Sequence, residues 1–541
     1  MKIIIYQILM RLYGNKNETR KANGTIEENG CGKMNNLSAS ELKKIRELGV
    51  THVWYTGILR HASTTDYTSH GIPCQHPAVV KGKAGSPYAI ADYYDVDPDL
   101  AVVVDKRMSE FERLVSRTHR AGLKVVIDFV PNHVARQYHS IAKPDGVRDL
   151  GEDDDTSAGF MPEKNNFYYC PGQAFMPYLD LYHGAKEPYQ EMPAKATGND
   201  CFHNSPTRND WYETVKLNYG VDYYAGGVGH FTPIPDTWHK MLHILLYWAS
   251  KRVDAFRCDM AEMVPAEFWD WAIAKVKEKY PEVAFIAEVY NPQKYRRYIA
   301  AGFDYLYDKV GMYDAVRDVV CHRRDVGAIT EAWQQTDDIG QHMLYFLENH
   351  DEQRVASDFF AADGRKAVPA LVACALMRQN PFMIYFGQEW GEKGMDAEGF
   401  SGHDGRTTIF DYWSFGSQAE RDAELETTYR HVLNIAKSER AVTDGLSFDL
   451  MYVNRQCCRQ YAFLRKAENE LLLVLTNFDD AAASVNLLLP EHAFKYLDIS
   501  EGTYLMTDLL SGQSMEAVLQ RNQSVNITIK PRGAQIWKIT F

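Results

Sequence analysis

Short apolar segments alternate with segments of helical period along most of this chain, and this alternation limits its fold more than any other feature. Apolar runs recur eight times between residues 3 and 386, and each leads into a stretch with apolar residues every three or four positions. Strands separated by helices form parallel sheets, and eight such units close into a barrel. The predicted strands are 3–9, 51–56, 124–130, 253–257, 283–288, 303–308, 343–348 and 381–386.

The segments between these strands carry helix signals of their own. In the first of them, Ser38 and Glu41 have the spacing of a capping box, and Leu42, Ile45 and Leu48 fall on one helical face. The predicted helices are 38–49, 107–122, 236–251, 265–280, 292–302, a helical stretch ending near 336, 364–379, and a last helix near 417–439.

A doubly wound open sheet is the rival architecture. It would need a glycine-rich phosphate-binding turn directly after an early strand. The glycines of residues 225–231 follow no convincing strand and lack the Gly-Lys-Ser/Thr ending of such a turn. The barrel is therefore the predicted architecture.

Two regions depart from the alternation. Residues 134–235, called domain B from here on, have loop composition with many prolines, glycines and aromatic residues. Beyond residue 445 the apolar period changes to two, which indicates antiparallel strands. The predicted fold is α/β: a (β/α)8 TIM barrel with domain B inserted after strand three and a C-terminal antiparallel β-sandwich. The expected domains are 1–133 and 236–444 for the barrel, 134–235 for domain B and 445–541 for the β-sandwich.

Composition excludes several classes of partner. A formal net charge of −13 argues against a nucleic-acid surface, which needs clustered Lys and Arg. No apolar span reaches 18 residues, so no membrane partner is expected. Arg11 interrupts the first apolar run, which is therefore read as a strand rather than a signal peptide. Nine cysteines without regular spacing do not suggest a disulfide framework, and a reducing, cytoplasmic location is expected.

Ionisable residues gather where the predicted strands end. The carboxyl ends of barrel strands meet at one face, so these residues should form one site. Glycosidic bond cleavage needs one carboxylate to attack or stabilise the sugar cation and one carboxylic acid to protonate the leaving oxygen. Like-charged neighbours help to keep that acid protonated. The residues at the ends of strands three, four, five and seven are Asp128, Asn132, His133, Arg257, Asp259, Glu288, His350 and Asp351.

Each feature also has a simpler interpretation. Asp128 is either a direct participant or a structural partner for Arg257 on the neighbouring strand. Glu288, taken alone, would more often be a solvated strand end. The aromatic residues of domain B are mostly packing, although sugar faces do stack on such rings. The acidic run 152–155 is read as a solvated loop, with a calcium site as the minority interpretation.

Four motifs in order give the chain a resemblance to a known family. "DFVPNH" (128–133), "DAFRCDMAE" (254–262), "FIAEVY" (285–290) and "FLENHDEQR" (346–354) resemble the four motifs of the α-amylase family, glycoside hydrolase family 13. The likeness extends over residues 1 to about 440. It implies a barrel with the inserted domain B and a C-terminal β domain.

The resemblance also implies roles for individual residues. Asp259 would be the nucleophile that forms a covalent glycosyl intermediate with retention of configuration. Glu288 would act as general acid and then as base, and Asp351 would grip sugar hydroxyls and stabilise the transition state. Arg257 would orient Asp259 and keep it ionised, because a nearby cation lowers the pKa of a carboxylate.

Further residues would bind the substrate. His133 and His350 would hydrogen-bond the sugar in the cleavage subsite, and Tyr88 would form its stacking platform. The sequence departs from the family on the acceptor side, where Glu262 and Met263 replace a common Lys-His pair. This departure leaves open the choice between hydrolysis and glucan transfer.

The expected function is that of a retaining α-glucan hydrolase acting on α-1,4 bonds of malto-oligosaccharides or starch- and glycogen-type polymers. The alternatives are a 4-α-glucanotransferase with the same intermediate, a non-catalytic glucan-binding protein, and a metal-dependent barrel hydrolase, which would need more converging histidines. No cofactor is expected to be required. Calcium is possible because Asn132 and Asp236 match calcium-binding positions of some members, but the surrounding domain-B loop is too divergent to carry it over. The expected partner is the glucan itself, and the oligomeric state is left open.

Overall fold

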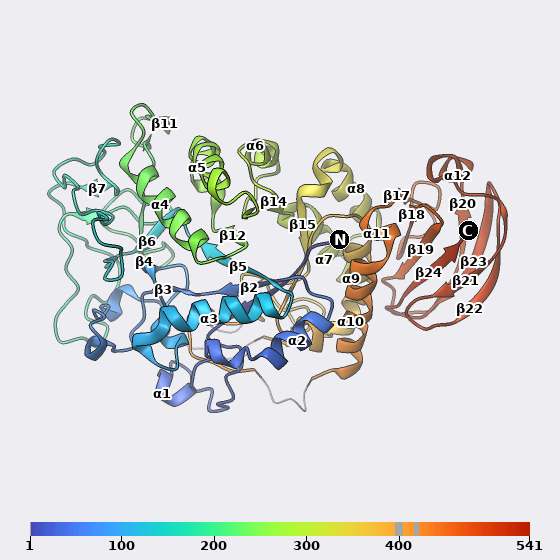
Figure 1. The fold of residues 1–541 in the computed structure, drawn as a ribbon, viewed down its shortest axis with the longest axis horizontal. Helices are drawn as coiled ribbons and strands as arrows, with labels where there is room; N and C mark the ends of the chain where they lie inside the picture. The colour runs from blue at the N-terminus through green and yellow to red at the C-terminus, as the bar shows by residue number, and fades with distance from the viewer. Residues whose placement is uncertain (1, 395–403, 416–420) are drawn as a thin grey trace.

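The centre of the molecule is a closed barrel of eight parallel strands (Figure 1). The computed structural model describes residues 2–394, 404–415 and 421–541. All eight predicted strands are confirmed, and their ends differ from the predicted ones by at most two residues. Going round the barrel, the strands are β1 (Ile4–Leu9), β16 (Phe382–Tyr385), β15 (Met343–Phe346), β14 (Tyr305–Tyr307), β13 (Ala284–Ala287), β12 (Ala255–Cys258), β5 (Lys124–Phe129) and β2 (His52–Thr56).

Helices between the strands cover the outside of this barrel. Ser38 caps the first long one by accepting the Glu41 backbone N–H at 3.2 Å, as its position in the sequence predicts. The stretch ending near residue 336 is two helices, and residues 417–420 of the last predicted helix lie outside the described residues. The helices are α2 (Ala39–Glu47), α3 (Arg107–Arg120), α4 (Asp236–Ser250), α5 (Ala266–Lys279), α6 (Tyr295–Ala300), α7 (Asp314–Val320), α8 (Gly327–Gln335), α9 (Val368–Leu376) and α10 (Ala423–Ser438).

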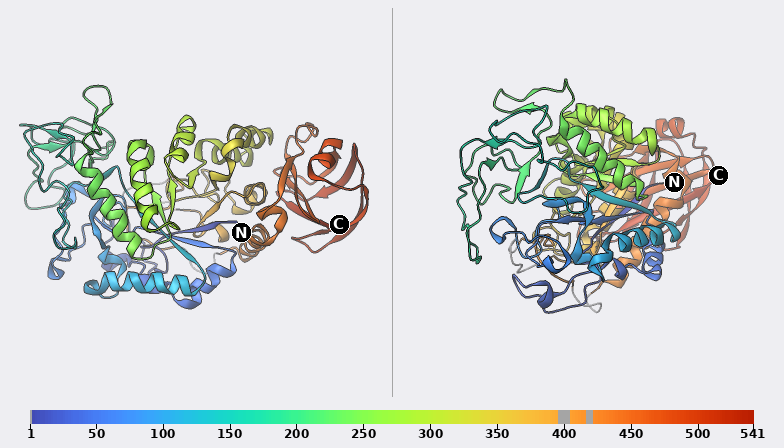
Figure 2. Two further views of the ribbon diagram at one scale, coloured as in Figure 1. Left: turned by 45° about the horizontal axis from the view of Figure 1, so that its top comes forward. Right: turned by 60° about the vertical axis from the view of Figure 1, so that its left-hand side comes forward.

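Domain B contributes no strand to the barrel. Most of it is irregular, with short strands such as β6 (His133–Ala135), which pairs in antiparallel fashion with β9 (Thr214–Lys216). It follows β5 directly and therefore lies beyond the carboxyl ends of the barrel strands. Domain B and the C-terminal β module lie at opposite ends of the molecule in Figure 1, and Figure 2 shows the same separation.

The C-terminal module consists of two antiparallel sheets. One has six strands in the order β17-β18-β19-β24-β21-β22, and the other pairs β20 with β23. The period-two pattern predicts most of these strands but misses β17 (Leu446–Asp449), β22 (Ser514–Leu519) and helix α12 (Glu491–Leu497). The remaining strands are β18 (Gln460–Ala467), β19 (Glu470–Asn477), β20 (Ala483–Leu489), β21 (Gly502–Asp508), β23 (Gln523–Ile529) and β24 (Ala534–Thr540).

A buried arginine joins this module to the barrel. Arg465 of β18 donates hydrogen bonds of 2.8–3.0 Å to four carbonyls, at Met377 just after α9 and at Ala441, Val442 and Gly445 in or near α11 (Arg440–Thr443). Carbonyls at helix C-termini lack intrahelical partners and carry partial negative charge. Arg465 therefore satisfies these carbonyls and fixes the module against the barrel.

Two properties concern the whole described chain. All nine cysteines are free thiols. Among residues 2–394, 404–415 and 421–541, no helix has both the length and the apolar character needed to cross a bilayer.

Candidate active site

Arg257 lies at the centre of the predicted site and contacts three carboxylates. Its Nη1 is 2.7 Å from Asp259 Oδ1 and 3.4 Å from Asp128 Oδ1, and its Nη2 is 2.8 Å from Glu288 Oε2. The strand register explains this convergence, since Arg257 of β12 lies opposite Asp128 of β5 and Ile286 of β13. Side chains two positions apart on a strand point the same way. Arg257 and Asp259 therefore face the same space as Glu288.

Burial dominates the electrostatics of these groups. It raises the pKa of Asp259 well above its ordinary value; Arg257 opposes this effect, and the like charges of Glu288 and Asp351 add to it. Burial likewise raises the pKa of Asp128, again against the influence of Arg257. Asp128 and Asp259 share one guanidinium nitrogen and cannot both ionise easily, so their titrations are coupled. The arrangement favours a cluster that retains a proton.

Two further donors hold Glu288. Its Oε1 accepts a hydrogen bond of 2.6 Å from the Tyr290 hydroxyl, and its Oε2 accepts one of 2.7 Å from the Met260 backbone N–H. Met260 has the left-handed backbone angles φ 43° and ψ 42°, which cost a non-glycine residue about 1–2 kcal/mol. Such strain persists where the surrounding structure enforces it, often at functional sites. Here it turns the N–H of Met260 toward Glu288.

His350 connects Asp351 to the barrel interior. Its Nε2 lies 3.0 Å from Asp351 Oδ2, and its Nδ1 lies 2.8 Å from Nε2 of Gln7 on β1. Gln7 donates to Nδ1, so the ring proton belongs on Nε2 and points to Asp351. Burial alone would raise the pKa of Asp351, but His350, together with Arg257 and Arg406, lowers it below its ordinary value. The Tyr88 ring stacks on His350 at 5.1 Å between centroids.

His133 lies at the edge of domain B and is neutral. Burial and the nearby Lys216 and Lys81 lower its pKa to about 3. Its ring meets the edge of Trp211 at 5.3 Å, and its backbone pairs with Lys216 of β9. His133 is therefore a hydrogen-bonding group rather than a cation at neutral pH.

A cavity of about 360 Å³ opens beside His350 and Asp351; Arg257, Asp259, Glu288, Tyr88 and His133 are not among the residues that line it. Its lining includes His350 and Asp351, and the Asp351 side chain is 38% exposed. The other walls come from Lys81, from Arg208 and Asn209 of domain B, and from the segment 404–410 after β16. The cavity is thus shared by the strand ends and domain B, as a site at the mouth of a barrel requires.

Sequence reasoning missed four side chains that support this site: Gln7, Trp54, Tyr290 and Tyr307. The indole of Trp54 donates to Asp128 at 3.0 Å, and the Tyr307 hydroxyl accepts from Arg257 at 3.2 Å. Spacing offered a signal for Tyr290, which follows Glu288 by two positions. Trp54 and Tyr307 lie inside apolar runs and look like ordinary core residues.

Protein cations occupy the oxygens proposed for calcium. Asn132 Oδ1 accepts from Lys216 Nζ at 2.7 Å, and Lys216 also contacts Asp200 at 2.6 Å. Asp236 contacts Arg148 at 2.7 Å and Lys240 at 2.9 Å. In the acidic run 152–155, Asp153 pairs with Arg148, and Asp154 accepts hydrogen bonds from the backbone of Asn166 and Phe167.

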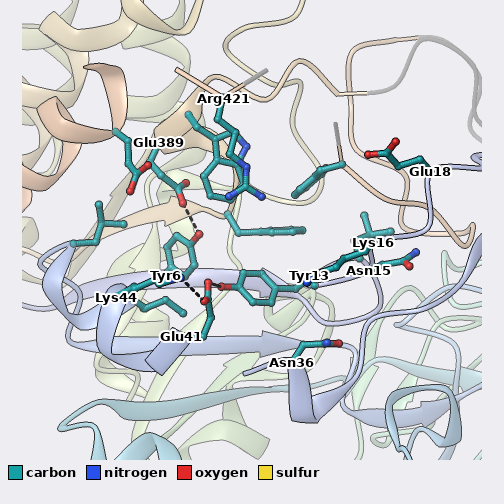
Figure 3. Close-up of a pocket in the computed structure, with 18 residues that line it drawn as sticks. Tyr6, Tyr13, Asn15, Lys16, Glu18, Asn36, Glu41, Lys44, Glu389 and Arg421 are labelled. Atoms are coloured by element: carbon teal, nitrogen blue, oxygen red, sulfur yellow. Dashed lines mark hydrogen bonds and ion pairs between the residues drawn. The ribbon is translucent and has the colours of Figure 1, made fainter. Parts of the chain in front are cut away.

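A larger cavity, about 810 Å³, contains none of the predicted site residues (Figure 3). It lies between β1, α2 and the short helix η11 (Gln388–Trp390). The Tyr6 hydroxyl donates to Glu389 at 2.5 Å, and the Tyr13 hydroxyl donates to Glu41 at 2.8 Å. Burial raises the pKa of Glu389 to about 7.

The fold and the site together define a (β/α)8 enzyme whose chemistry depends on carboxylates, as in glycoside hydrolases. The family described as "Alpha amylase, catalytic domain" matches residues 22–431. The chain therefore belongs to the α-amylase family, which confirms the resemblance of its four motifs.

Individual relatives agree with this assignment. The chain is 25% identical over 453 residues to "Alpha-amylase MalA" of Haloarcula japonica, which covers 82% of this chain and 52% of that protein. It is 21% identical to "Alpha-amylase 3" of Dictyoglomus thermophilum, with 88% of this chain and 84% of that protein covered. The chain thus spans about half the length of the first relative and most of the second.

A solved structure shares the fold. The maltogenic α-amylase AmyB of Thermotoga neapolitana superposes with a TM-score of 0.65 at 19% identity, with 100% of this chain and 99% of that chain covered. At this identity the likeness concerns the fold alone.

Proposed function

We propose that this protein is a retaining α-glucan hydrolase that cleaves α-1,4-glucosidic bonds through a covalent glycosyl-enzyme intermediate. The observation that carries the proposal is the pair of contacts on one guanidinium: Asp259 on Nη1 and Glu288 on Nη2 of Arg257. Neighbouring nitrogens keep the two carboxyl groups close together, and a short separation is what distinguishes retaining from inverting enzymes.

In the first step, an Asp259 oxygen attacks the anomeric carbon while the bond to the leaving oxygen breaks. Glu288 gives its proton to that oxygen, and the products are a glycosyl ester on Asp259 and a shortened glucan. In the second step, Glu288 takes a proton from water, and the resulting hydroxide attacks the anomeric carbon and releases Asp259. The configuration is inverted twice and hence retained.

Other residues would bind the sugar. We assign Asp351 and His350 to sugar hydroxyls, since both line the cavity beside the cluster. Neutral His133 would donate or accept one hydrogen bond, and Tyr88, stacked on His350, would offer a ring face to the sugar.

The test combines a variant with stereochemical analysis. Asp259→Asn keeps the shape of the side chain and removes its nucleophilicity, so hydrolysis of maltoheptaose should fall by roughly 10⁴-fold or more. NMR of the wild-type reaction should show the α-anomer first. Undiminished hydrolysis by Asp259→Asn, or first release of the β-anomer, would refute the proposed mechanism.

Glucan transfer is the second candidate, because Glu262 changes the acceptor side. Glu262 accepts the backbone N–H groups of Tyr290 at 3.2 Å and Asn291 at 3.3 Å, so it fixes the loop that follows Glu288. A sugar hydroxyl that replaced water in the second step would lengthen the glucan. Incubation with maltotriose separates the two candidates, since oligomers longer than the substrate appear only with transfer.

We further propose starch- or glycogen-type polymers as the physiological substrates and a cytoplasmic location. Nine free thiols, some of them exposed, suit a reducing compartment. We also propose that no calcium is required, because Lys216 supplies a cation to Asn132 and Asp200 where domain B joins the barrel.

A further inference from the structure

A groove of about 700 Å³ lies between the barrel and the C-terminal β module. Its barrel side is formed by α8 and by residues just before β15 and β16. Its other side is formed by β17, β18 and α12. Figure 1 shows α8 next to β17 and β18 at this junction.

The groove is remote from the active site. Gln341 and Gln379, which line it, precede β15 and β16, whereas His350 and Asp351 follow β15. The groove therefore lies at the amino ends of the strands and the active site at their carboxyl ends. A ligand in the groove would not touch the catalytic cluster.

Aromatic rings line the groove mainly on the side of the β module. Trp333 of α8 faces it from the barrel, and Phe448, Tyr452 and Tyr496 face it from the β module. The Phe448 ring lies 6.0 Å from both tyrosine rings. Tyr452 is 40% exposed and Tyr496 is 56% exposed. Each of these two rings therefore has part of its surface open to solvent, where a ligand can contact it.

The charged groups of the groove are paired within the protein. Asp449 accepts hydrogen bonds from the side chains of Thr330, Trp333 and Tyr461. Arg378 pairs with Asp337, and Arg465 donates to four backbone carbonyls. Among the other groups that line the groove are the exposed rings, His492 and the amides of Gln334, Gln341 and Gln379, and Gln379 also donates to the Gly445 carbonyl at 3.4 Å.

We propose that this groove is a second binding site for α-glucan chains. Stacking rings beside neutral amides suit an uncharged, polyhydroxylated ligand. The inference rests on the proposed function, which makes an α-glucan the substrate. A polymer long enough to reach both ends of the barrel would gain affinity from simultaneous contact, whereas a short oligosaccharide would not.

The test measures binding without turnover. Tyr452→Ala/Tyr496→Ala is introduced into the Asp259→Asn protein, and migration is followed in native gels that contain amylopectin. The double substitution should weaken the retardation roughly tenfold. Tyr178→Ala removes a tyrosine that is 77% exposed on domain B and is the matched control, which should keep full retardation.

Activity provides the second readout. In the active protein, Tyr452→Ala/Tyr496→Ala should leave kcat/KM for 4-nitrophenyl α-maltotrioside unchanged and lower it several-fold for amylopectin. Equal retardation with and without the two tyrosines would overturn the proposal, and so would equal losses on both substrates. A dimer that dissociates on the double substitution, with retardation unchanged, would instead make the groove a subunit interface.

Failure of the proposed function would look different. If the wild-type protein hydrolysed no α-glucan, the active-site proposal would fall. Retardation of the Asp259→Asn protein would still show whether the groove binds amylopectin, because that measurement does not depend on catalysis.

Discussion

Replacing Arg257 should move the pH dependence of the reaction in a defined direction. As the proposed nucleophile, Asp259 must be ionised to attack the sugar, and Arg257 opposes the raised pKa that burial gives it. A hydrogen bond to a charged group contributes about 1.5–3 kcal/mol, and about 1.4 kcal/mol corresponds to one pH unit. In Arg257→Met, the acid limb of kcat/KM should therefore shift upward by about one to two pH units.

The same substitution should alter stability in a way that depends on pH. Removing one partner of a buried ion pair costs about 3–5 kcal/mol, because the remaining charges are left without compensation. Arg257 contacts Asp128, Asp259 and Glu288, so the loss should be largest near neutral pH and smaller in acid, where these carboxyl groups are protonated.

Arg257→Lys is the matched control. It keeps the positive charge but replaces the planar fork by a single ammonium, which cannot contact all three carboxylates. Its acid limb should move less than that of Arg257→Met. The assay is the pH profile of kcat/KM on 4-nitrophenyl α-maltotrioside, with urea unfolding measured at pH 5 and pH 8. A folded Arg257→Met protein with an unmoved acid limb would refute the assigned role of Arg257.

Three further predictions concern other parts of the molecule. Tyr290→Phe removes the 2.6 Å hydrogen bond to Glu288 and should lower kcat about tenfold with little change in KM or in the circular dichroism spectrum. Burial raises the pKa of Glu389 from 4.5 to about 7. Between these two pH values the folded protein therefore holds a proton that the unfolded chain has released. The free energy of unfolding falls as the pH rises through this range. Glu389→Gln should remove about 3 kcal/mol of the decline in unfolding free energy between pH 4.5 and pH 8, and an unchanged decline would contradict the assignment. Lys216→Met removes the contacts of this lysine with Asn132 and Asp200 and should lower the unfolding free energy by about 1–3 kcal/mol. EDTA should leave the melting temperature of the wild-type protein unchanged. A lower melting temperature in EDTA would show that a metal is needed.

The barrel was predictable because its strands are apolar on both faces and its helices carry a separate period. Phe256 and Phe285 are buried on neighbouring strands, and the residues that follow such runs fall at one end of the barrel by geometry alone. The grouping of Arg257 with Asp259 and Glu288 follows from the same register. Position at a strand end was therefore enough to bring these residues together.

Contacts between distant segments were not predictable in this way. Tyr6 and Glu389 are 383 positions apart, and no local pattern marks either as a partner of the other. The short strands of domain B contain too few residues to show a period. Arg465 lies within a strand whose alternation predicts its place in the sheet, but its four carbonyl partners depend on where α9 and α11 end.

Cations supplied by the chain itself organise both the catalytic cluster and the junction with domain B. Arg257 holds the carboxylates of three strands, and Lys216 joins Asn132 of the barrel to Asp200 of domain B. A fixed cation is in place before substrate arrives, so the protein does not reorganise these charges during the reaction. The two cations also differ in what their loss would affect. In the proposed mechanism, Arg257 sets the ionisation of Asp259, whereas Lys216 ties domain B, which lines part of the cavity, to the barrel. Substitutions at the two positions should therefore separate effects on pH dependence from effects on substrate binding.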